Sequence, residues 1–187
     1  MSPSPAASIP PLDSVRHARD DFRLIISFEE SQHFGTTTLQ HVKDGVFLVD
    51  NIVEQRLSDL FAGLQHYASV TNAIIDDMEE YMPWIWAPID TIIRRSRQYA
   101  DAFDKIVTAY TKLARLFVPL CVFNKDSPGN LGLVETLAAY YVNILMFHQH
   151  IYMFVWQRDH DFNPPTPWEM TEGQLEDILE DMQTHIS

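Results

Sequence analysis

The sequence predicts an all-α protein, a bundle of six to seven helices with one long, mostly uncharged core helix at residues 131–158. Large apolar residues recur at alternating spacings of three and four, which is the period of one face of an α-helix. Residues 136–157 contain no Asp, Glu, Lys or Arg, which is typical of a helix buried in the centre of a bundle. The 187 residues are 46% hydrophobic and 12% aromatic, enough to build a sizeable core.

The chain divides into a short leader and one domain. Residues 1–12 contain four prolines and small residues, so we expect a disordered leader, and they lack the basic and apolar regions of a secretory signal. Residues 13–187 are expected to form a single helical domain. Cys121 is the only cysteine, which excludes an internal disulfide and fits a reducing compartment. We therefore expect a cytoplasmic protein.

The first half of the domain is expected to hold three helices. The first runs from a cap at Asp13 or Ser14 to about residue 28, and residues 29–35 are expected to form a polar turn. The run Thr37-Thr38-Leu39-Gln40 fits a capping box, so a second helix should follow and continue to residue 53. Gly45 inside it is either tolerated or marks a close neighbouring backbone.

The second half carries the strongest helical patterns. Apolar residues from Tyr99 to Leu120 trace one unbroken stripe, and Pro128 and Gly129 mark a turn before a helix capped by Asn130. A proline-rich linker follows, and Thr171 opens a further capping box. The expected helices from the third onward span residues 57–78, 84–97, 99–119, 131–158 and 171–186.

The sequence shows no arrangement of residues that supports catalysis. No GxxxxGK[ST] motif is present, so nucleotide binding is not expected, and no catalytic, cofactor-binding or metal-binding residue is assigned. His148, His150 and His160 cannot face one point from a single helix, and Cys121 is expected to be a buried, inert thiol. Only 13 Lys and Arg stand against 26 Asp and Glu, for a net charge of −13, which argues against nucleic-acid binding.

The uncharged helix is long enough to cross a bilayer, yet its polar residues argue for a core position. Its apolar residues contribute about −0.3 to −0.6 kcal/mol each on the insertion scale. Asn143, His148, Gln149 and His150 would each cost about 2 kcal/mol or more if left unpaired in hydrocarbon. A core helix is therefore favoured over membrane insertion, although membrane contact after rearrangement stays open.

Several stretches together resemble a known family. They include Trp86-Ala87-Pro88 followed by aliphatic residues, the run 99–106, Ala109-Tyr110, the run 138–148 and the closing run 175–179. In order and spacing they resemble the N-terminal helical domain of fungal NACHT-type STAND proteins, and the likeness covers most of residues 18–186. Ala87 stands where the family usually has glycine, and residues 152–158 lack its frequent basic cluster. The core of the shared pattern is Trp86, Pro88, Ile89, Phe103, Ile106, Tyr110, Tyr141, Leu145 and Phe147.

The resemblance implies a non-enzymatic signalling or effector module. In that architecture a nucleotide-binding oligomerisation domain and a ligand-sensing repeat domain follow the N-terminal module, so the chain is either an excised domain or a solitary member. The resemblance also implies that oligomerisation brings copies together and that the bundle then recruits a protein partner.

Three other interpretations rest on particular residues. The uncharged run suggests a membrane-permeabilising cell-death executor, and Trp84, Trp86 and Trp156 suggest a bundle that binds a small molecule. The last helix carries an acidic face that is either solvated or meets a basic partner. That candidate interaction face consists of Glu176, Asp177, Glu180 and Asp181.

Overall fold

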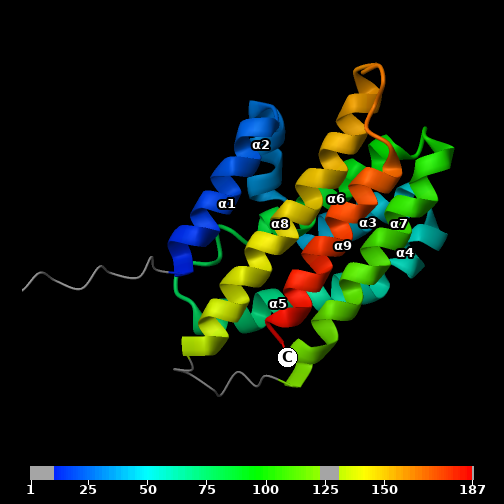
Figure 1. The fold of residues 1–187 in the computed structure, drawn as a ribbon. Coiled ribbons are helices and arrows are strands. Elements are labelled where there is room, and N and C mark those ends of the chain that lie inside the picture. The colour runs from blue at the N-terminus through cyan, green and yellow to red at the C-terminus, as the bar shows by residue number, and fades with distance from the viewer. Residues whose placement is uncertain (1–10, 123–130, 187) are drawn as a thin grey trace, which may run out of the picture.

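The computed structural model describes residues 11–122 and 131–186, and within them the all-α prediction is confirmed (Figure 1). The helix count differs from the expected six to seven, because the described residues form nine α-helices and one 3-10 helix, η1. These are α1 (Pro11–Ile25), α2 (Phe28–Thr36), α3 (Leu39–Val49), α4 (Asn51–Arg56), α5 (Ser58–Ile74), α6 (Pro83–Ser96), α7 (Ala100–Ala114), η1 (Arg115–Val122), α8 (Leu131–Asp159) and α9 (Trp168–Thr184).

Helix α8 is the centre of the bundle, as the sequence predicts. It packs against α1, α6 and α9, and Figure 1 shows it lying between α1 and α9. Tyr141, Leu145 and Phe147 on this helix are fully buried. Among the described residues, no helix combines the length and the hydropathy that crossing a membrane requires.

His148 is a buried polar residue with a partner at each ring nitrogen. The imidazole of His148 lies between the Tyr110 hydroxyl, 2.9 Å from Nδ1, and the Ile85 carbonyl oxygen, 2.7 Å from Nε2. Nε2 donates to that carbonyl, so Nδ1 accepts from the tyrosine. Complete burial lowers the pKa of His148 to about 4. The ring is therefore neutral at pH 7 and acts as a bridge between α6, α7 and α8.

The polar turn expected at residues 29–35 is wrong, because these residues lie in α2. Ser27 is the N-cap: its hydroxyl accepts from the Glu30 backbone N–H at 3.1 Å, and the Glu30 carboxylate accepts from the Ser27 N–H at 3.1 Å. This reciprocal capping box satisfies two backbone donors at the start of the helix. Phe34 is fully buried and fixes α2 to the core.

The second expected helix is divided in two at Asp50. This residue has an extended backbone (φ −165°), and its Oδ1 accepts from the Ile52 N–H at 2.8 Å, which starts α4 in a new direction. At the other end Thr38 caps α3 by accepting from the His41 N–H, while the Gln40 side chain donates to Asp44. The expected capping box is thus reduced to a single threonine cap.

Gly45 lies on the side of α3 that packs against α6. A Cβ atom at this position would lie 2.4 Å from Oδ1 of Asp90, so a side chain here would collide with the carboxylate. The close neighbour is therefore a side chain and not a backbone. Burial raises the pKa of Asp90, while Arg94, 2.8 Å from its Oδ2, opposes that rise.

The helices expected at 84–97 and 131–158 appear within one residue of those limits, and the helix expected at 99–119 is α7 continued by η1. Helix α9 begins earlier than expected, at Trp168, so Thr171 lies inside the helix, buried, and forms no capping box. Residues 1–10 of the expected leader, residues 123–130 of the expected turn and the Asn130 cap lie outside the described residues. Pro11 and Leu12 belong to α1.

Candidate interaction surface

The outer side of α3 and α4 carries three large apolar side chains in solvent. Phe47 is 57% exposed, Leu48 83% and Ile52 63%. We call these three residues the α3–α4 surface. Single exposed apolar residues are ordinary, but three within six positions across a helix junction concentrate apolar surface in one segment of the chain.

The local sequence explains why these residues face outward. Val42 and Val46 already fill the inner side of α3, and Val53 fills that of α4. Residues 46–49 are all apolar, and four consecutive positions cover the whole circumference of a helix, so they cannot all face the core. The excess apolar residues must therefore lie in solvent.

Polar contacts fix both ends of this surface to the rest of the bundle. At the α3 end, Arg97 donates to the Val49 carbonyl oxygen and its Nη1 lies 3.6 Å from Asp50 Oδ2. At the α4 end, Arg56 Nη1 lies 2.6 Å from Asp104 Oδ1 on α7. A surface held at both ends loses little conformational freedom when it binds a partner.

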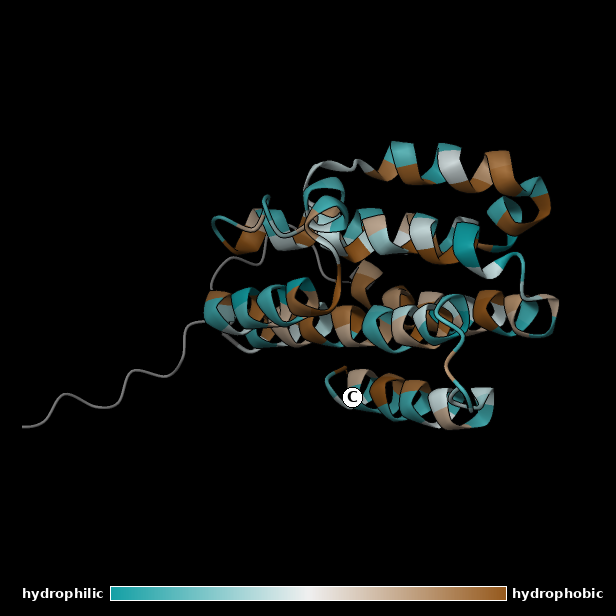
Figure 2. Cartoon of the chain, turned by 90° about the horizontal axis from the view of Figure 1, so that it is seen from above, coloured by the Kyte–Doolittle hydropathy of each residue, from teal (hydrophilic) through white to brown (hydrophobic). Residues whose placement is uncertain are grey.

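The charge on α3 and α4 differs sharply from the charge on α9. In residues 39–56, Lys43 and Arg56 stand against three acids, whereas α9 carries six acids and no Lys or Arg. Figure 2 shows that α3 and α4 lie at one edge of the molecule and the C-terminal helix at the opposite edge. The six acids of α9 are thus far from the α3–α4 surface.

The acidic face predicted on α9 is partly engaged within the molecule. Glu176 Oε1 lies 2.6 Å from Lys112 Nζ on α7, and Asp181 Oδ2 accepts from Asn143 Nδ2 on α8 at 2.8 Å. Asp177 and Glu180 form no ion pair with any residue that the structure describes. Two of the four acids therefore anchor α9, and a role for the face in binding a basic partner stays a prediction.

The residues of the family-like pattern lie in the interior. Seven of the nine are buried, while Trp86 and Phe103 are half-buried. The Trp86 indole Nε1–H donates to the Thr37 carbonyl oxygen at 2.7 Å, which joins α6 to the α2–α3 connection. These side chains hold helices together and do not line a site.

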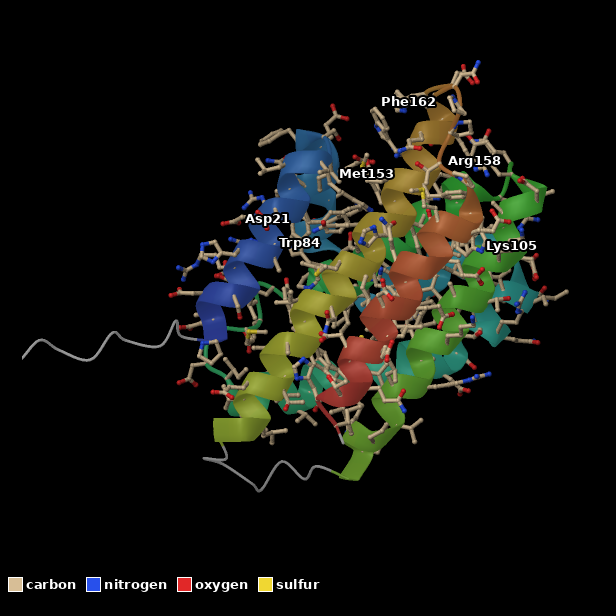
Figure 3. All side chains as sticks on the ribbon, in the orientation of Figure 1. Asp21, Trp84, Lys105, Met153, Arg158 and Phe162 are labelled. Carbon is tan, nitrogen blue, oxygen red and sulfur yellow. The ribbon has the colours of Figure 1, made fainter. Side chains whose placement is uncertain are left out.

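The tryptophans have separate packing partners. Trp84 is buried, with ring centroids 5.7 Å from Phe34 and 6.0 Å from Phe22. Trp156 stacks on His160 at 4.2 Å near the end of α8. The position of Trp84 is labelled in Figure 3, between α1 and α8, while Phe162 marks the far end of α8. The surroundings of Trp84 and Trp156 are those of packing residues.

The histidines and Cys121 have side chains that can bind a metal ion. Within residues 11–122 and 131–186, no three His, Cys, Asp or Glu side chains are placed to hold a metal ion. Cys121 is exposed, so the expected burial of this thiol is wrong. It lies in η1, whose tighter turns direct Phe117 and Leu120 inward and Cys121 outward.

No protein-family model, no curated protein and no solved structure matches this chain.

The α3–α4 surface was not singled out from the sequence. The signal for it was the run of four consecutive apolar residues 46–49. A helix with a single buried stripe would have polar residues between its apolar positions.

Proposed function

We propose that this chain is a non-enzymatic protein-interaction module that assembles with further copies of itself and then recruits a protein partner. The observation that carries the proposal is the α3–α4 surface, on which three large apolar side chains are exposed within six positions of the chain. Contiguous exposed apolar patches mark interaction sites on soluble domains.

A second copy of the chain is the partner that best fits this surface. Each copy carries a net charge of −13, so copies repel one another at long range. That repulsion is smallest where the acids are fewest, and the α3–α4 edge lies opposite the six acids of α9. Burying one apolar side chain of this size contributes about 1.5–3 kcal/mol to the free energy of association. Each copy would bury three such side chains.

The family resemblance gives this assembly a context. We propose that the chain is the N-terminal signalling or effector module of a fungal NACHT-type STAND receptor, acting in the cytoplasm. A downstream nucleotide-binding domain would then raise the local concentration of the module, because linked modules meet at effective concentrations of about millimolar. Weak contacts between α3–α4 surfaces are then populated at protein concentrations too low for separate modules to assemble.

Sedimentation equilibrium of the purified chain over a wide concentration range tests this proposal. We expect reversible dimerisation with a Kd on the order of 100 μM, because association costs offset most of the gain from a small patch. The triple variant Phe47→Ser, Leu48→Ser, Ile52→Ser should stay monomeric over the same range.

A matched control separates this surface from apolar exposure in general. Leu24, Phe28 and Met170 are 84%, 74% and 63% exposed on other helices, so their triple serine variant should dimerise like the natural chain. A chain that stays monomeric at millimolar concentration, or a control variant that also loses dimerisation, would rule out assembly through the α3–α4 surface.

A further inference from the structure

A second feature of the surface is a groove between α5 on one side and α7 with η1 on the other. Its volume is about 560 Å³, within the range of small-molecule sites. Small residues line its base: Ala62 and Gly63 on α5 and Ala114 on α7. Val118, which is 67% exposed, forms part of its wall. The groove is therefore mainly apolar and open to solvent.

The groove lies beside a point where α5 and η1 pack closely. A Cβ at Gly63 would lie 2.8 Å from Cβ of Phe117, so α5 and η1 are in contact there. Phe117 itself is buried and forms the floor beside Gly63. Around this contact the short side chains of Ala62 and Ala114 do not reach across to the opposite helix, and the gap between the helices stays unfilled.

The charge at the groove is reversed relative to the chain as a whole. Arg56 and Arg115 line it against one acid, Asp59, whereas the chain has 13 basic and 26 acidic residues. Arg56 is held by Asp104 at 2.6 Å. Arg115 is exposed, and no carboxylate in the described part of the chain lies within ion-pair distance of it. The groove thus has one cation that is available to a ligand.

His66 is a further polar residue of the groove, and its imidazole already has a partner. The Nε2 of His66 lies 3.2 Å from the Leu120 carbonyl oxygen, and an imidazole nitrogen beside a carbonyl must be the N–H donor. This bond joins α5 to η1 across one end of the groove. His66 therefore shapes the groove, and Arg115 is left as the group that would meet a ligand's charge.

We propose that this groove binds a medium-chain alkyl carboxylate, that is, a free fatty acid. The alkyl chain lies along Ala62, Gly63 and Ala114, and the carboxylate pairs with the Arg115 guanidinium, whose planar fork matches a carboxylate with two parallel hydrogen bonds. This activity goes beyond assembly through α3 and α4, and it neither requires nor excludes that assembly.

An alkyl tail with an anionic head could also come from an anionic phospholipid in a bilayer. The net charge of −13 opposes the approach of the whole domain to an anionic surface. A single dissolved molecule meets Arg115 without bringing other charges near the domain. We therefore assign the groove to the free acid.

Cys121 provides a direct reporter, because it is the only cysteine in the chain, is exposed and lines this groove. The experiment measures the rate at which iodoacetamide alkylates Cys121 in the full chain, by intact-protein mass spectrometry, with laurate kept below its micelle concentration. We expect saturating laurate to slow alkylation about tenfold, because the bound alkyl chain covers the thiol. The apparent Kd follows from the laurate dependence of the rate.

Two variants separate the charge contact from apolar binding. Arg115→Gln should raise the Kd for laurate about tenfold, the amount expected for loss of one charge-assisted contact. Lys105→Gln removes another exposed cation without an ion pair, on α7 but outside the groove, and should leave the Kd unchanged. Circular dichroism checks that each variant keeps its helical content.

Three results would overturn the assignment. The first is no protection by laurate. The second is equal protection by laurate and by dodecyltrimethylammonium, which would show an apolar groove without preference for an acid. The third is protection by phosphatidylglycerol vesicles alone, which would show that the groove meets a membrane surface instead of a free fatty acid.

Discussion

The two opposite edges of the bundle use their apolar residues in contrasting ways. On α9, Leu175, Ile178 and Met182 are buried against the bundle, and the acids point outward. On α3 and α4 the inner positions are equally well buried, yet Phe47 and Leu48 lie in solvent beside them. Folding accounts for these three apolar residues of α9, but not for Met170, which is 63% exposed on the same helix, nor for the α3–α4 surface.

This difference indicates what each edge does. An amphipathic helix with a solvated acidic face contributes to stability and solubility. Exposed apolar side chains contribute little to the isolated fold, which is the basis of the proposal that the α3–α4 surface binds a partner. The comparison therefore predicts that changes at α9 alter stability, whereas changes on the α3–α4 surface alter assembly.

The same substitution on the two edges should give the largest contrast. Leu175→Ala is expected to lower the free energy of unfolding by about 3 kcal/mol, because Leu175 is 2% exposed and its loss leaves a cavity. Leu48→Ala should change it by less than about 0.5 kcal/mol. Urea denaturation of both variants measures this, and equal losses would show that Leu48 packs against the bundle.

The pH dependence of stability tests the interior that both edges share. His148 binds a proton with its ordinary pKa of 6.5 when unfolded and with a pKa of about 4 when folded. Between these values the unfolded state binds more protons, so stability is fully present above pH 6.5 and falls as pH falls toward 4, by up to about 3 kcal/mol.

Urea denaturation between pH 7 and 4 measures this contribution of His148. The natural chain should lose stability on acidification, and His148→Gln, whose amide can still donate to Ile85, should lose less. Equal losses in the natural chain and in His148→Gln would contradict a neutral, buried His148 as the source of the pH dependence.

The inner side of α3 should be far less tolerant of an added methyl group than the open end of α2. Gly45→Ala places a methyl group against the Asp90 carboxylate and is expected to cost about 1–3 kcal/mol. Gly35→Ala is the control: nothing lies within 4 Å of a Cβ at Gly35, so about 0.5 kcal/mol of stabilisation is expected from helix propensity. Thermal unfolding compares them, and a harmless Gly45→Ala would mean that Asp90 moves aside freely.

The smallest effects are expected from the ion pairs that tie each edge to α7. Lys112→Gln removes the contact with Glu176, and Arg56→Gln removes the contact with Asp104. Both pairs are solvent-exposed, so each change should cost about 0.5 kcal/mol or less. Urea denaturation at low and high salt measures this, and a loss that persists in high salt would contradict a screened surface pair.

The sequence predicted the interior of the fold better than its edges. Helices α6, α7 and α8 were recognised because long apolar stripes set their limits. Helix α2 was missed because its residues are mostly polar and only Phe34 reaches the core, although Ser27 and Glu30 already had capping-box spacing. The break at Asp50 was missed because valines continue the helical period on both sides of it.

The candidate sites were harder to predict because they depend on contacts between distant residues. The acids of α9 were recognisable as a charged face, but the pairing of Glu176 with Lys112 depends on how α7 and α9 pack. The clash that Gly45 avoids comes from Asp90, forty-five positions further along the chain. The exposure of Cys121 depends on the 3-10 geometry of η1, which its apolar neighbours did not indicate.

The most direct test joins two copies of the chain by a flexible Gly/Ser linker. Backbone hydrogen exchange is then measured in the joined protein and in the single chain. At an effective concentration of about millimolar, the account predicts slower exchange in residues 39–56 than in the single chain, with no change in residues 168–184. The Phe47→Ser, Leu48→Ser, Ile52→Ser variant of the joined protein should lose this protection. Protection confined to residues 168–184, or to neither edge, would contradict assembly through the α3–α4 surface.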